Sequence, residues 1–80
     1  MFLDRFNPMG NPNSMKPVTR AIYDCILDFP GETVSFLFRE TGYPMLSILD
    51  ALNRLEEQNF IVVDRSYVDP GCYRCYPTLD

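Results

Sequence analysis

The amino-acid sequence predicts an α+β fold that is mainly helical, with three helices followed by a two-stranded β-hairpin. Three segments between residues 18 and 58 carry apolar residues at helical spacing, and Gly or Pro separates each segment from the next. After residue 59 the pattern changes to two short runs rich in β-branched and aromatic residues around an Asp-Pro-Gly turn, which is typical of a hairpin. The 80 residues suffice for one small domain.

Residues 1–17 are predicted to form an N-terminal arm, because Gly10 and three prolines break any periodic pattern. The arm also contains apolar residues, which indicate either a strap packed on the same domain or an arm exchanged in a dimer: Phe2, Leu3, Phe6 and Met9. Both interpretations stay open. The domain itself is expected to comprise residues 18–80.

The first helix is expected at residues 18–29. Pro17 suits a first turn, where its missing N–H costs no hydrogen bond, and Pro30-Gly31 ends the helix. The apolar residues of this segment share one helical face: Val18, Ile22, Cys25, Ile26 and Phe29.

The second helix is expected to follow Thr33, which is a suitable N-cap residue. Its inward-facing residues are predicted to be Val34, Leu37 and Phe38. Gly42 ends this helix, because glycine readily adopts the left-handed conformation of a tight turn.

The third helix has the clearest periodic pattern. It is expected to begin near Pro44 and to run to Gln58, with Asn59 as a C-terminal cap in the left-handed region. Its inward face is predicted to contain Ile48, Leu52 and Leu55.

The hairpin is predicted from residues 60–68 and 72–78, joined by the turn at residues 69–71. If Pro70 and Gly71 are the two central turn residues, Asp69 pairs with Cys72. Two Arg–Tyr pairs then share one face of the hairpin, Tyr67 with Arg74 and Arg65 with Tyr76. A longer loop is the alternative, since a Pro-Gly turn fits a two-residue hairpin poorly.

Two short helices joined by a Gly-containing turn form a helix-turn-helix, and the hairpin that follows them adds a wing. Residues 52–61, LNRLEEQNFI, are similar to the end of the recognition helix in MarR-like and related bacterial regulators. Residues 31–34 and 41–44 resemble the starts of the second and third helices of these regulators. The chain therefore resembles a winged helix-turn-helix domain over residues 18–78.

This resemblance implies a small transcription regulator that binds duplex DNA as a dimer. The third helix would lie in the major groove, with the wing on an adjacent groove or on the backbone. Carried onto this sequence, the DNA-binding residues would be Ser47, Asp50, Asn53, Arg54, Arg65 and Arg74.

The charge and the apolar residues of the third helix favour an alternative function. The chain has seven basic and eleven acidic residues, a net charge of −4, and phosphate binding depends on Lys and Arg. An exposed apolar patch would instead suit a protein-interaction module that binds another regulator, a polymerase or itself. Its partner-binding residues would be Met45, Leu46, Leu49, Tyr67 and Tyr76. Some of the helix residues could equally turn inward and extend the core.

The sequence predicts neither an enzyme nor a cofactor or metal site. It contains no His as a general base and no Gly-rich phosphate motif. Cys72 and Cys75 form a lone CxxC, and residues three apart in a strand point to opposite faces. A redox pair, or a zinc site shared between two chains, is the alternative interpretation of these thiols.

The chain is expected to be cytoplasmic and to have no membrane partner. It has no apolar run long enough for a transmembrane helix, and its N-terminal residues do not follow the pattern of a secretory signal. Its three cysteines, an odd number, suggest reduced thiols.

Overall fold

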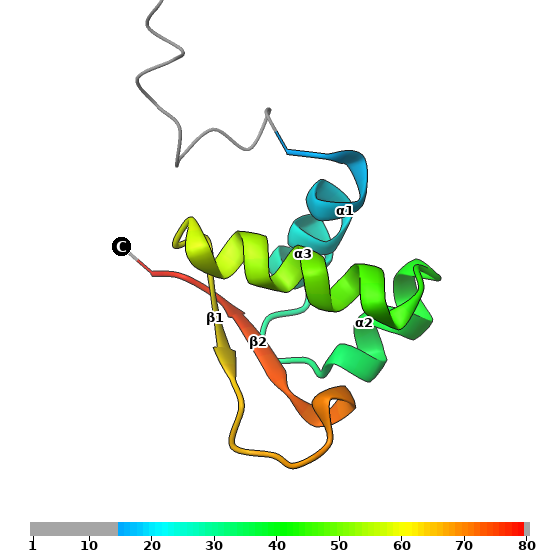
Figure 1. The fold of residues 1–80 in the computed structure, drawn as a ribbon. Coiled ribbons are helices and arrows are strands. Elements are labelled where there is room, and N and C mark those ends of the chain that lie inside the picture. Colours follow the sequence, from blue (N-terminus) through cyan, green and yellow to red (C-terminus); the bar gives the residue numbers. More distant parts are fainter. Residues whose placement is uncertain (1–14, 80) are drawn as a thin grey trace, which may run out of the picture.

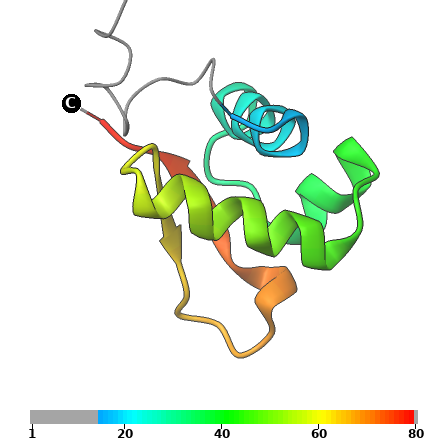
Figure 2. The same cartoon turned by 45° about the horizontal axis from the view of Figure 1, so that its top comes forward.

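The computed structural model, which describes residues 15–79, confirms the predicted fold class. Three helices are followed by a two-stranded antiparallel hairpin, and α3 lies across the molecule with α1 above it and the hairpin below it (Figures 1 and 2). The proposed arm contacts at residues 2–9 lie outside the described part of the chain. The elements in chain order are α1 (Pro17–Asp28), α2 (Val34–Thr41), α3 (Met45–Glu57), β1 (Ile61–Asp64), the 3₁₀ turn η3 (Pro70–Cys72) and β2 (Arg74–Pro77).

The first two helices begin and end close to the predicted residues. Pro17 stands in the first turn of α1, and the Thr33 side chain caps α2 by accepting a hydrogen bond from the Phe36 N–H at 3.1 Å. Gly42 ends α2 with a φ of 77°, as expected. Two predictions of burial are wrong, because Phe29 and Phe38 are exposed, Phe38 by 43%. Phe29 lies beyond the last turn of α1. Phe38 is turned about 100° from its buried neighbour on the short α2.

Helix α3 provides the central part of the core. Ile48, Leu52 and Leu55 are fully buried as predicted, and Ala51 is buried beside them. Asn59 follows the helix with a φ of 66°, which confirms the expected left-handed cap. The helix packs on α1, α2 and β1, so its inward face is fixed from three sides.

The hairpin is shorter than predicted and has a different register. Val62 lies opposite Tyr76, and Asp64 lies opposite Arg74. The predicted pairs of Arg65 with Tyr76 and of Tyr67 with Arg74 are therefore wrong. Asp69 and Cys72 do bond across Pro70 and Gly71, with the Cys72 N–H donating to the Asp69 carbonyl at 2.8 Å, but they close the 3₁₀ turn η3 and do not continue the strands. Residues 65–69 form the longer loop that the sequence left open, which we call the wing loop.

Two aspartates explain why the strand ends early. The Asp64 carboxylate accepts hydrogen bonds from the backbone N–H and the hydroxyl of Ser66, and the Asp69 carboxylate accepts one from the Gly71 N–H. Such local side-chain bonds compete with strand pairing and favour turns. They stabilise a loop between β1 and η3 where regular strands were predicted.

The connection between α1 and α2 adds an unpredicted isolated β-bridge beside the two-stranded sheet. Thr33 forms an antiparallel bridge with Arg74. The Cys75 N–H donates to the Glu32 carbonyl at 3.1 Å, and the Gly31 N–H donates to the Cys75 carbonyl at 2.8 Å. Strand β2 is thus paired on both sides, with β1 as the outer strand.

All three helices and both strands contribute to one core. Its buried residues are Ile22, Cys25, Ile26, Val34, Leu37, Ile48, Ala51, Leu52, Leu55, Ile61, Val63 and Cys75. Tyr23 and Phe60 flank it with ring centroids 5.2 Å apart. Within residues 15–79, no helix has the length and apolar character required to cross a bilayer.

Candidate binding surface on α3 and the wing

The surface that contains most of the predicted binding residues consists of the outward side chains of α3 together with the wing loop; we call it the α3–wing surface. Asp50, Asn53 and Arg54 are exposed on α3, and Ser47 is half-buried. Positions 47, 50 and 54 are three or four residues apart, so they share the outward side of the helix. The helix register therefore places the predicted DNA-binding residues of α3 together.

The predicted apolar patch is largely absent from this surface. Met45 and Leu49 are half-buried and pack against the core, whereas Leu46 is 81% exposed. The α3 residues of the patch therefore divide between core and solvent, and Leu46 alone among them is fully available for contact.

Arg54 is paired along its own helix. Its Nε lies 3.0 Å from Asp50 Oδ2 in an i, i+4 pair, and both side chains are largely exposed. Exposed pairs of this kind contribute less than about 1 kcal/mol, so the pairing is weak.

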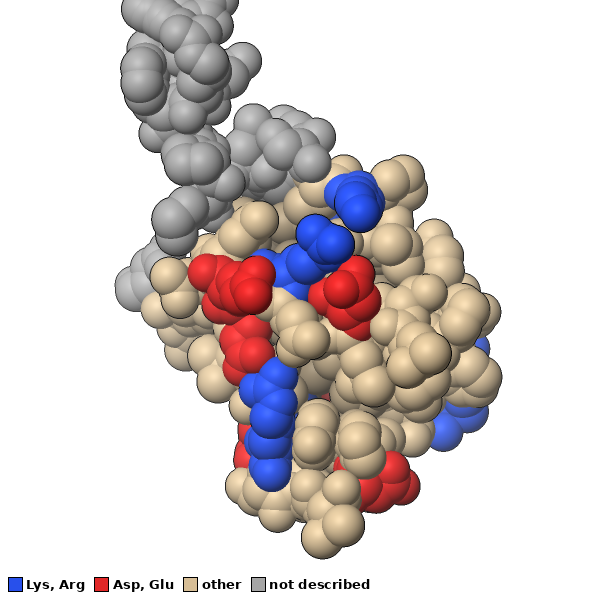
Figure 3. Space-filling view, viewed as in Figure 1, with Lys and Arg blue, Asp and Glu red and all other residues tan. Residues whose placement is uncertain are grey.

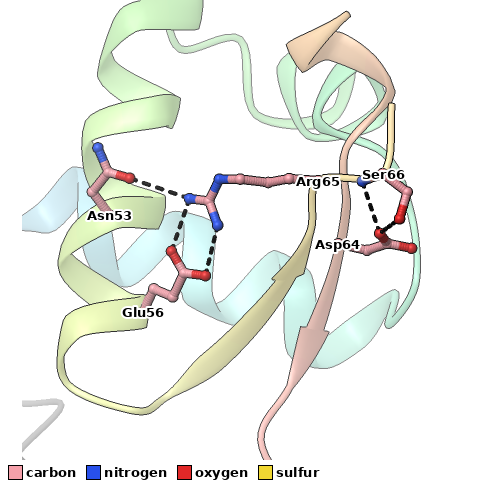
Figure 4. A network of polar contacts seen from close by, with 5 residues as sticks. All are labelled: Asn53, Glu56, Asp64, Arg65 and Ser66. Carbon is pink, nitrogen blue, oxygen red and sulfur yellow. Dashed lines mark hydrogen bonds and ion pairs between the residues drawn. The ribbon is translucent and has the colours of Figure 1, made fainter. Parts of the chain in front are cut away.

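Arg65 is held more firmly, by groups from two different elements. Figure 4 shows its side chain running from the end of β1 to α3, where Nη1 and Nη2 contact the two Glu56 carboxylate oxygens at 2.7 and 2.8 Å. Nη2 also donates to the Asn53 side-chain oxygen at 3.4 Å, and the guanidinium lies 5.7 Å from the centroid of the Tyr73 ring. We call these contacts the Arg65 clamp.

The clamp changes the protonation behaviour of both partners. The hydrogen bond from Arg65 lowers the pKa of Glu56 below its ordinary value, against an opposing effect of burial. The same hydrogen bond raises the pKa of Arg65. A two-point arginine–carboxylate contact is among the stronger side-chain hydrogen bonds, so the charges of both groups are matched within the domain.

Arg74 is also engaged, but with the backbone. Its Nη1 donates to the Gly31 carbonyl at 2.7 Å and thereby ties β2 to the α1–α2 connection. Hydrogen bonds from Ser66 lower the pKa of Asp64, which lies opposite Arg74 in the hairpin, and the charge of Arg74 adds a smaller effect. All three arginines predicted to contact DNA therefore have partners inside the domain.

The charge distribution agrees with these pairings. Figure 3 shows acidic and basic groups side by side over α3 and the hairpin, without a continuous basic patch. From residue 45 to residue 79 the chain has three arginines and five acidic residues, namely Asp50, Glu56, Glu57, Asp64 and Asp69. The α3–wing surface is thus net acidic.

The wing loop adds apolar groups to this surface. Val68 is fully exposed, and Tyr67 is 40% exposed. Val68 is not among the predicted binding residues, because residues 60–68 were predicted to form a strand; the signal for its exposure was its position directly before Asp-Pro-Gly. Tyr76 is exposed outside the loop, opposite Val62, with its ring close to Gly31. The predicted Tyr67 and Tyr76 therefore do not form one patch.

The two cysteines of the CxxC segment lie in different surroundings. Cys72 is exposed in η3, whereas Cys75 is buried in the core, where desolvation raises the pKa of its thiol to about 12. Among residues 15–79 no three side chains of the types that ligate metals gather into a possible metal site. Cys25 belongs to the core, as the sequence suggested, and burial raises its pKa.

Comparison with known proteins does not assign the chain to a family, since no family model, no curated protein and no solved structure matches it.

Proposed function

We propose that this domain is a non-catalytic binding module that recognises a protein partner through the α3–wing surface. The observation that carries the proposal is the engagement of Arg54, Arg65 and Arg74 by groups of the domain itself. Non-specific DNA affinity comes largely from Lys and Arg that neutralise phosphates. Here such contacts would first require the exchange of internal partners, on a surface that is net acidic.

The exposed apolar groups on the same surface suit a protein partner. Leu46 from α3 and Tyr67 and Val68 from the wing loop present carbon-rich area to solvent. Protein interfaces derive most of their affinity from a few such groups, with tyrosine enriched among them. The acidic residues around these groups favour a partner segment of positive charge and disfavour like-charged competitors.

A DNA-binding regulator remains a second candidate, because one observation favours it. Ser47, Asn53 and Arg54 are located on the outward part of α3, the helix that enters the major groove in winged helix-turn-helix regulators. The Asp50–Arg54 pair is weak, so a DNA phosphate could replace Asp50 at modest cost.

Binding of fluorescent duplex DNA at about 50 mM and about 200 mM salt separates the two candidates, because phosphate-dominated affinity changes steeply over this range. We expect no salt-sensitive binding. Salt-sensitive binding that Arg54→Ala weakens would overturn the proposal. The matched control is Arg20→Ala on α1, since Arg20 forms an equivalent exposed i, i+4 pair with Asp24 outside the α3–wing surface.

The apolar contacts need a separate test. A protein captured by the immobilised wild-type domain should be lost from Leu46→Ala and retained by Leu79→Ala. The two leucines have similar exposure, 81% and 89%, but Leu79 lies outside the α3–wing surface. Equal retention by both variants would show that this surface does not bind the captured protein.

A further inference from the structure

In the described part of the chain, the wing loop contacts the helices through side chains and lacks the backbone hydrogen bonds that hold the strands of the hairpin. Within residues 15–79, residues 65–68 make no backbone–backbone hydrogen bond. The carboxylates of Asp64 and Asp69 cap the two ends of the loop, but these bonds are local. They set the shape of the loop ends without fixing the loop relative to α3.

The Arg65 clamp supplies the connection that is otherwise missing. Among the described residues, Arg65 is the member of the wing loop whose side chain hydrogen-bonds to a helix. Its two acceptors, Asn53 and Glu56, are three residues apart on α3 and therefore lie on one side of the helix. The buried neighbours Leu52 and Leu55 hold that part of α3 in the core, so the clamp is anchored on a rigid element.

We propose that the Arg65 clamp is a latch that holds the wing loop against α3, and that the loop becomes mobile when the contacts of the clamp are broken. The closed state places Tyr67 and Val68 in a fixed position relative to α3. In the open state they would belong to a mobile loop. The latch thus determines whether the α3–wing surface is preorganised, whichever partner it binds.

Loop mobility can be measured by backbone ¹⁵N relaxation at residues 66–69. In the wild type we expect order parameters close to about 0.85, the value of rigid backbone, and in Glu56→Gln values below about 0.6. Asp50→Asn is the matched control, since it removes one carboxylate from α3 and breaks the Arg54 pair without touching the loop. It should leave the loop unchanged.

A double-mutant cycle makes the test specific for the clamp. If Arg65 and Glu56 act on the loop through each other, Arg65→Gln, Glu56→Gln and the double variant should mobilise it to the same extent. Order parameters of Leu52 and Leu55 amides report whether each variant keeps its core. Because Gln replaces two partly exposed side chains, we expect these core values to stay at their wild-type level.

Three results would overturn the latch. The wild-type loop could already have order parameters below about 0.6, so that nothing holds it. Glu56→Gln could leave the loop rigid. The two single effects could add in the double variant, which would show that each residue acts independently.

Discussion

Replacing Glu56 by Gln should make the stability of the domain less dependent on pH. The substitution keeps the size of the side chain but removes the carboxylate charge that Arg65 contacts. Arg65 lowers the pKa of Glu56 in the folded state relative to the unfolded value of about 4.3. The pair therefore stabilises the native state above that value, and this contribution is lost as the pH falls through the folded pKa.

The exposure of the pair limits the expected magnitude. The side chains of Arg65 and Glu56 are 42% and 33% exposed, so solvent screens their attraction and exposed-pair values of about 0.2–1 kcal/mol apply. The two-point geometry and the added contacts to Asn53 and Tyr73 place the pair at the upper end of this range. Glu56→Gln should thus lower the free energy of unfolding by about 1 kcal/mol near neutral pH, where the pair is intact.

Urea unfolding followed by far-UV circular dichroism at about pH 7 and about pH 3 measures this difference. Wild type and Glu56→Gln should differ near neutrality, and the difference should shrink as the pH falls below the unfolded value and through the lowered folded pKa of Glu56. The control is Glu57→Gln. This substitution removes the same charge from the neighbouring residue of α3, whose side chain is exposed. An equal loss in the control, or a difference that does not shrink as the pH falls, would refute the contribution of the ion pair.

Three further changes have expected outcomes. Gly31→Ala should destabilise the domain by about 1–3 kcal/mol in urea unfolding, because Gly31 has a φ of 84° and a Cβ there would lie 3.2 Å from the Tyr76 ring; an unchanged midpoint would contradict this. Thiol labelling of the folded protein should modify Cys72 readily and Cys75 only after unfolding, since burial raises the pKa of Cys75 to about 12; equal rates would show that the core is open. Asn59→Gly should keep or slightly raise the melting temperature, whereas Asn59→Val should lower it, because the φ of 66° disfavours a β-branched side chain. The reverse order of melting temperatures would contradict the left-handed conformation of Asn59.

The helices could be predicted because their signals are local. Each apolar stripe follows a 3.6-residue period, and Thr33 and Gly42 mark the ends of α2 through their own chemistry. Burial failed at Phe38 because periodicity alone does not tell how wide the buried stripe of a short helix is. The sequence therefore predicted the helical segments more accurately than the burial of residues at the edges of each apolar stripe.

The hairpin register could not be predicted in the same way. It depends on the loop conformation set by Asp64 and Asp69, whose capping bonds compete with strand pairing. The bridge between Thr33 and Arg74 involves a single residue pair 41 positions apart, so it leaves no periodic pattern. Non-local pairing of this kind is determined by the assembled fold.

The candidate binding residues could be named individually from the sequence, but their partners within the domain were missed. The Asp50–Arg54 pair follows from i, i+4 spacing and was open to prediction. The clamp between Arg65 and Glu56 depends on the path of the hairpin back to α3, and the bond from Arg74 depends on the unpredicted approach of the α1–α2 connection to β2 at Gly31. A sequence pattern shows which arginines are present but not which of them are neutralised.

Arg65 and Arg74 each have a structural role in the domain that does not involve DNA. Arg74 connects β2 to the α1–α2 segment, and Arg65 connects the wing to α3. The backbone of Val63 on β1 also contributes to the lowered pKa of Glu56, after the larger effect of Arg65. Because the contacts that stabilise the hairpin also occupy these arginines, we expect its surface to bind phosphate weakly, in line with the proposed protein partner.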